Sequence, residues 1–257
     1  MLSCNLMNQD DEVQDFERAT HEAAADPVAQ EARLSLASFT AKTFLETGDQ
    51  LHFFGHVIGR ARITGQSPFG HGSDATVGIS LLLRIAAQLV SAITSLFSDG
   101  RHYAAAALLR QLVEVEYLTW AFESGDRDAD AWLRSTKEER MSFFTPAKLR
   151  QAAAGRFRGK DYGYHCELGG HPVPGSSLLL RDHKTIVELL LSDLLGHTGR
   201  IWNHTMGWVR MTPYGDTFRE LNDQMAAQYS DWRAADRLVD LPPPSLKRLR
   251  WSSGSSS

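Results

Sequence analysis

Arg110 and Glu114 form an oppositely charged pair inside a largely apolar stretch, residues 101–122. Residues four apart on a helix lie one turn apart on the same face, so these side chains can reach each other. Burying either ion alone is costly, which means that each charge needs a partner or a wider polar network. We expect either an ion pair that fixes helix packing or a polar binding site. Glu116 lies on another face of this stretch, which indicates a surface position or pairing with another helix.

A second concentration of reactive side chains lies in residues 161–174, DYGYHCELGGHPVP. His171 precedes Pro172, which disfavours a continuing helix, so its imidazole is expected to project from a helix end into a loop. Histidine exchanges protons near neutral pH and a tyrosine can orient a phosphate or a water, a combination that suits acid–base chemistry on a phosphodiester. The alternative is that His171 caps the last carbonyls of the preceding helix.

The same segment offers potential zinc ligands in His165, Cys166 and His171. Their spacing matches neither a paired-cysteine pattern nor an HExxH pattern. We therefore predict no metal site here, and no cofactor.

Another set of polar side chains follows one helical stripe, because Asp193, His197, Arg200 and His204 fall within about 60° of arc. A carboxylate and imidazoles at these spacings could hold a metal ion or orient a catalytic histidine. Such a stripe is more typical of the solvent-facing margin of a helix. We favour the margin, and leave open whether Asp193, His197 and His204 form a site.

These side chains must be positioned by helices, because nearly every periodic segment has helical spacing and alternating β-branched runs are scarce. We predict an all-α fold, a multi-helix bundle built around an antiparallel hairpin of apolar helices, residues 77–97 and 101–122. Only Ser98, Asp99 and Gly100 lie between those two stretches. Further helices are expected over residues 27–47, ended by Gly48, and over about 126–154, 182–209 and 215–239.

The 257 residues carry a formal charge of −4 and are 42% hydrophobic, the balance of an ordinary globular protein. We expect one domain over residues 1–240 with a long Gly-rich loop at 59–74, followed by a disordered basic and Ser-rich tail at 241–257. The negative charge gives no net attraction for nucleic acid, so such a partner would need a local basic patch.

The sequence predicts a cytoplasmic protein, because it has two cysteines and an N-terminus without an apolar signal segment. Residues 77–97 approach the length of a membrane span, but Arg84 and Gln88 lie in the middle of them. We therefore predict a buried soluble helix and no membrane partner. The phosphate-loop pattern GxxxxGK(S/T) and the nucleophile-elbow pattern GxSxG do not occur in the chain.

One combination of these features resembles a known group of proteins. The apolar stretch LLRQLVEVEYLTWAF is followed by a variable helical region and then by the Tyr-rich segment that ends in His171-Pro172. Over about residues 75–210 this order is similar to a broad set of uncharacterised bacterial all-helical proteins, which in turn resemble HEPN domains. The resemblance implies a helical bundle, commonly a dimer, and many HEPN proteins are metal-independent ribonucleases of toxin, RNA-processing or phage-defence systems.

The chain departs from that group at one position of its motif. Ribonuclease HEPN members carry an arginine several residues before the active histidine, whereas residues 165–170 here contain no arginine. His171 would correspond to the histidine, and the cation that stabilises the phosphate would have to come from Arg110 or Arg181.

From these residues and this resemblance we expect a protein that binds RNA or a nucleotide, with ribonuclease activity in a toxin or phage-defence system. His171 would handle the proton, Arg110 would face the phosphate, Glu114 would orient Arg110, and Tyr164 would position the substrate. Further partners would be a second copy of the chain or another protein. The alternative is a non-catalytic helical module that dimerises or binds a partner. The catalytic hypothesis requires His171 and Arg110 to open onto one cleft.

Overall fold

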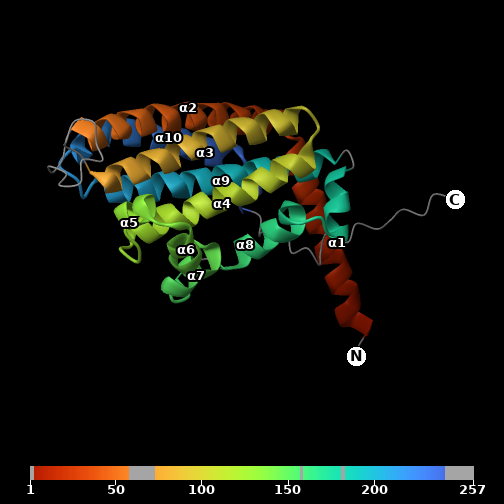
Figure 1. Ribbon diagram of the computed structural model, residues 1–257. Coiled ribbons are helices and arrows are strands. Elements are labelled where there is room, and N and C mark those ends of the chain that lie inside the picture. The colour runs from red at the N-terminus through yellow and green to blue at the C-terminus, as the bar shows by residue number, and fades with distance from the viewer. Residues whose placement is uncertain (1–2, 58–72, 157–158, 181–182, 241–257) are drawn as a thin grey trace.

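The computed structural model of the chain describes residues 3–57, 73–156, 159–180 and 183–240. Every regular element within these ranges is helical, which confirms the predicted all-α fold. The long helices form a bundle, and α1 (Ser3–Ala25) crosses one end of it (Figure 1). The bundle consists of α2 (Pro27–Val57), α3 (Asp74–Ser98), α4 (His102–Glu123), α9 (Lys184–Val209) and α10 (Arg219–Ala235). Within it α2 packs on α3, α3 on α4, α4 on α9, and α10 on α2.

Short elements connect the long helices. Between α4 and α9 the chain forms α5 (Ala129–Arg134), α6 (Lys137–Glu139), the π-helix η1 (Arg140–Phe144), α7 (Pro146–Ala152), α8 (Gly159–His165), the π-helix η2 (Cys166–Gly170) and the 3-10 helix η3 (Pro174–Leu180). The 3-10 helices η4 (Gly215–Phe218) and η5 (Arg237–Asp240) flank α10. We call the described part of residues 129–170, from α5 to η2, the short-helix segment. In Figure 1, α5 to α8 lie on one side of α4.

The predicted apolar hairpin is confirmed in α3 and α4. Ser73 caps α3 by accepting a hydrogen bond from the backbone N–H of Thr76 at 3.3 Å. The turn after α3 uses Gly100 at φ +73°, a left-handed conformation that glycine adopts without a steric penalty. The N–H of Arg101 then bonds the carbonyl of Leu96 at 2.8 Å, which closes the turn.

The prediction that Gly48 ends a helix is wrong, because α2 continues to Val57. Gly48 lies where α2 approaches α3 closely. A Cβ atom there would be 2.6 Å from Cγ of Arg84 and 3.1 Å from the carbonyl oxygen of Ser80. The missing side chain therefore permits the contact between the helices. The predicted loop at 59–74 lies almost wholly outside the described residues, as does the predicted tail at 241–257.

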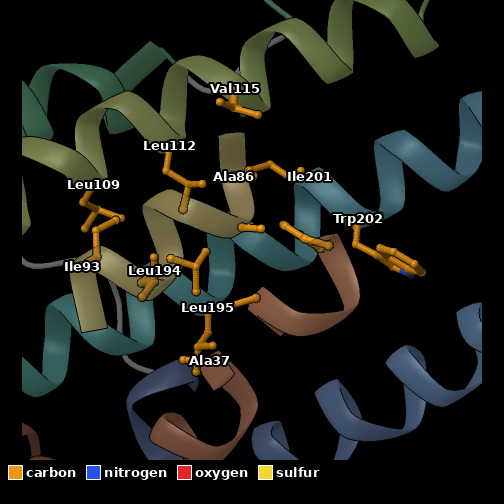
Figure 2. Packing of buried hydrophobic residues seen from close by; sticks show 14 of the residues in the cluster. Ala37, Ala86, Ile93, Leu109, Leu112, Val115, Leu194, Leu195, Ile201 and Trp202 are labelled. Carbon is orange, nitrogen blue, oxygen red and sulfur yellow. The ribbon is translucent and has the colours of Figure 1, made fainter. Parts of the chain in front are cut away.

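One large apolar core joins the helices of the bundle (Figure 2). Its labelled members come from α2, α3, α4 and α9: Ala37, Ala86, Ile93, Leu109, Leu112, Val115, Leu194, Leu195, Ile201 and Trp202. Trp202 is 2% exposed and stacks on Phe44 with ring centroids 6.0 Å apart. Because α4 and α9 share this core, polar side chains at its edge on the two helices face each other.

Within the described ranges, α3 alone is long and apolar enough to cross a membrane, and 61% of its most apolar stretch is buried against other helices.

Candidate functional site

The segment from α8 to η2 rests directly on α4, and a glycine makes this possible. A Cβ atom on Gly169 would lie 2.7 Å from backbone atoms of both Ala106 and Ala107. The backbone of η2 therefore touches the backbone of α4 at its first turns. This contact keeps α8 beside α4, so that Tyr162 reaches Arg110 and Glu114.

The predicted pair on α4 forms, with Arg110 Nη1 3.3 Å from Glu114 Oε1. Arg110 Nη1 also donates to the hydroxyl of Tyr162 at 3.0 Å, and that hydroxyl donates to Glu114 at 3.3 Å. Burial and the Glu114 carboxylate raise the pKa of Tyr162, which keeps its hydroxyl protonated as a donor. Arg150 of α7 lies over the same ring, with Cζ 4.9 Å from its centroid. We call these four side chains the Arg110 cluster.

The Arg110 cluster is neither sealed nor fully exposed, because the Arg110 and Glu114 side chains keep 25% and 35% of their exposure. It includes the predicted Arg110 and Glu114, but its tyrosine is Tyr162 rather than the predicted Tyr164. A charged pair at a partly solvent-exposed position is compatible both with ligand binding and with a role in helix packing.

His171 is exposed and ends η2 in an extended conformation, at the position where Pro172 predicts that a helix stops. Its carbonyl oxygen accepts a hydrogen bond from Ser176 Oγ at 3.4 Å. In the described part of the chain, no hydrogen bond or ion pair joins His171 to Arg110. The segments that carry His171 and Arg110 are nevertheless in contact, because Gly169 touches α4 at Ala106, one turn before Arg110.

A second and more buried group of side chains lies between α8 and α9, and we call it the histidine cluster. It consists of His165, Asp193 and His197. The Nε2 atoms of the two histidines are 3.0 Å apart. Asp193 places Oδ2 3.2 Å from His165 Nε2, and Oδ1 3.5 Å from His197 Nε2. His165 and His197 are each 1% exposed, whereas the side chain of Asp193 is 35% exposed.

Glu116 of α4 stands behind this cluster, 4% exposed. His197 Nδ1 donates to Glu116 Oε2 at 2.5 Å, and Arg200 Nε donates to Glu116 Oε1 at 2.7 Å. Burial raises the pKa of Glu116, but the hydrogen bond and charge of His197 and the charge of Arg200 outweigh it and lower the pKa to about 2. Glu116 is therefore an anion at neutral pH. Its carboxylate binds the Nδ1 side of the His197 ring, so Nε2 is the ring nitrogen that faces His165.

His165 is neutral at pH 7, because burial lowers its pKa to about 4 in spite of the Asp193 carboxylate. Tyr164 packs edge-on against its ring, with centroids 5.3 Å apart. Burial and Asp193 raise the pKa of Tyr164. The predicted substrate-positioning tyrosine thus lies with the histidine cluster and not with Arg110.

The prediction that His197 lies on a solvent-facing margin is wrong, because its ring is enclosed between α9 and α4. His204, on the same stripe, is instead paired with Glu123, with Nδ1 2.6 Å from Oε2. Of the two positions predicted for Glu116, at the surface or paired with another helix, the structure shows the second, because Glu116 pairs with Arg200 of α9. A carboxylate amid Val115 and Tyr117 was the available signal, since a buried anion in an apolar run requires a cationic or hydrogen-bonding partner from another helix.

Comparison of the chain with protein-family models, with curated proteins and with solved structures found no match. The similarity to HEPN domains therefore stays a sequence-based prediction. A function is therefore inferred from the chemistry of the side chains, including those of the Arg110 cluster and the histidine cluster.

Proposed function

We propose that this protein binds RNA or a nucleotide through the side of the molecule that carries the short-helix segment. The observation that carries the proposal is the distribution of arginine–aromatic contacts. Every such contact within the described ranges lies on this side, and together we call them the arginine–aromatic surface. It comprises Arg110 and Arg150 on Tyr162, with Arg127 on Phe143 and Arg156 on Trp120, at 4.9–5.9 Å from guanidinium carbon to ring centroid.

The chemistry of this surface suits a ligand that has both phosphates and bases. Guanidinium groups bind phosphate oxygens in a bidentate manner, and unpaired bases stack on aromatic rings and on guanidinium planes. The side chain of Arg156 is 55% exposed, with Nη2 donating to both carboxylate oxygens of Asp126 at 2.7 Å, and Phe143 is 50% exposed, so an arginine and an aromatic ring can both be reached by a ligand.

The local charge supports the same ligand. The whole chain has a formal charge of −4, but residues 140–160 contain no Asp or Glu. The basic residues of that stretch whose side chains the structure describes are Arg140, Lys148, Arg150 and Arg156. This is the kind of local basic patch that an acidic protein needs in order to attract a nucleic acid.

A fluorescence-anisotropy titration with a labelled single-stranded RNA tests the proposal. Arg150→Gln is expected to weaken binding by about tenfold, since a lost phosphate or stacking contact is worth roughly 1–3 kcal/mol. It should also make the affinity less dependent on salt, because fewer counterions are released. The matched control is Arg219→Gln, which removes an exposed arginine at the start of α10 and should leave the affinity unchanged. Equal affinities of the parent protein and Arg150→Gln would refute the proposal, as would an affinity that salt does not alter.

Ribonuclease activity is the second part of the proposal, with His171 as the proton-transfer group and Arg110 and Glu114 at the phosphate, where Tyr162 takes the place expected for Tyr164. The exposed position of His171 supports this role because a bound strand can reach the ring. His171→Ala should abolish cleavage of the same RNA while leaving its affinity and the melting temperature unchanged. Equal cleavage by parent and variant would remove His171 from the mechanism.

A further inference from the structure

The geometry points to a binding site for a divalent transition-metal ion, best suited to Zn²⁺, formed by Nε2 of His165, Nε2 of His197 and the carboxylate of Asp193. These three side chains offer ligand atoms that all lie within 4.8 Å of one another. The site is independent of RNA binding and rests on other residues than the arginine–aromatic surface.

The spacing of the ligand atoms is the first argument. In a tetrahedral zinc site with bonds of about 2.0–2.1 Å, neighbouring ligand atoms are separated by about 3.3 Å. The closest separations here are 3.0 Å between the two Nε2 atoms, and 3.2 and 3.5 Å from these atoms to the oxygens of Asp193. The three side chains thus converge, with each imidazole nearest to a different oxygen of Asp193, and a small rotation of the carboxylate would bring one oxygen to both.

The unsatisfied carboxylate oxygen is the second argument. Asp193 Oδ2 is buried and makes no hydrogen bond, although it lies 3.2 Å from His165 Nε2. A buried carboxylate oxygen without a donor is costly unless a cation completes its environment. A metal ion placed between the oxygen and the imidazoles would satisfy it.

Glu116 supplies the third argument, because it acts on a ligand rather than on the metal. Metal-binding histidines commonly donate their other ring N–H to a carboxylate, which fixes the tautomer and turns the free nitrogen toward the ion. The 2.5 Å contact from His197 Nδ1 to Glu116 Oε2 has this form, and Arg200 holds the carboxylate from its other side. Glu116 is therefore a positioning residue for the site.

The composition of the site indicates which ion it would take and what that ion would do. Two imidazoles and one carboxylate favour zinc over calcium or magnesium, which prefer oxygen ligands. Three protein ligands leave a fourth position, and the partly exposed Asp193 lies on the accessible side. Because His165 ends α8 and the other two ligands lie one turn apart on α9, the ion would also fasten the short-helix segment to the bundle.

Titration of the chelator-treated full-length protein with Zn²⁺ or Co²⁺ tests this site. The parent should bind one equivalent, show the visible absorption of tetrahedral Co²⁺, and gain melting temperature as Zn²⁺ is added, since an ion that binds only the folded state stabilises it. Asp193→Asn should lose the Co²⁺ spectrum and the thermal shift. Glu116→Gln should keep the spectrum but bind about 10- to 100-fold more weakly.

His204→Gln is the matched control, because it removes a histidine of α9 that pairs with Glu123 outside the cluster, and it should bind like the parent. Asp193 is partly exposed, so its variant is expected to fold, and circular dichroism checks this. The inference is overturned if the parent takes up no stoichiometric ion, or if Asp193→Asn binds as tightly as the parent. Either result can occur whether or not the protein binds RNA.

Discussion

Two glycines of the short-helix segment differ in what a side chain would meet. At Gly169 a Cβ atom would lie within 2.8 Å of two backbone atoms and a Cβ atom of α4, whereas at Gly163 nothing lies within 4 Å. Backbone atoms cannot move aside as the end of a flexible side chain can. The close approach of η2 to α4 therefore depends on one of these glycines and not on the other.

Gly169→Ala should accordingly destabilise the protein by about 1–3 kcal/mol, the usual cost of overpacking. Gly163→Ala adds the same methyl group to α8 without a clash, and it should be neutral or stabilising by up to about 1 kcal/mol because alanine favours a helix. Urea denaturation followed by circular dichroism measures both. Equal unfolding free energies for the two variants would mean that η2 does not pack on α4 as described.

Contacts between residues close in the sequence could be predicted, whereas contacts between helices could not. Arg110 and Glu114 are four apart on one helix, so a local rule is enough to pair them. The choice of Tyr162 over Tyr164 as their partner depends on how α8 rotates against α4, which no local rule gives. The sequence predicts the wrong environment for His197 for a similar reason, because the edge of a helical stripe has the same residue pattern whether water or another helix covers it.

At the scale of elements, one buried arginine ties together segments from both ends of the described chain. Arg33 of α2 is 0% exposed and forms paired contacts of 2.8 and 2.6 Å to Asp236, just after α10. It also contacts Glu188 of α9 at 2.7 Å and the carbonyl of Ala23 in α1 at 3.3 Å. These bonds hold α1 and the end of α10 against the bundle.

Replacing Arg33 with methionine should cost about 3–5 kcal/mol of unfolding free energy, because the buried Asp236 carboxylate loses its cation. Arg18→Met is the control. Arg18 pairs with Asp15 on the surface of α1, where both side chains are about two-thirds exposed, and such pairs contribute at most about 1 kcal/mol. Chemical denaturation measures the loss of unfolding free energy in each variant. A loss for Arg33→Met as small as that for Arg18→Met would show that the buried Arg33 contacts are not needed for stability.

The helices themselves could be predicted where a single pattern decides them. The α3–α4 hairpin follows from two apolar stretches and a three-residue connection. Gly48 shows the limit, because a glycine in a helical pattern indicates either a helix end or a close contact between helices. The contact with α3 decides between these alternatives, and it exists only in the folded molecule.

Across the whole molecule, burial is uneven. Long runs of buried residues lie in α3, α4 and α9, whereas α6 and η1 bury no residue and α5 and α7 bury one each. Local opening costs little free energy where few apolar side chains are buried. The α5–α7 part of the short-helix segment, which carries Phe143 and Arg150, is therefore held least firmly, whereas His165 and Leu168 at its α8–η2 end are buried against the bundle.

Hydrogen exchange followed by mass spectrometry can test this distribution and separate the two ligands. Without ligand, peptides from residues 129–152 should exchange faster than those from α3 and α9, because their hydrogen bonds are secured by fewer buried contacts. Single-stranded RNA should slow exchange mainly in residues 140–156, while Zn²⁺ should slow it in residues 162–170 and around Asp193 in the parent but not in Asp193→Asn. Uniform exchange along the chain would contradict the inferred weakness of the segment. Identical protection by both ligands would mean that the arginine–aromatic surface and the histidine cluster form one site rather than two.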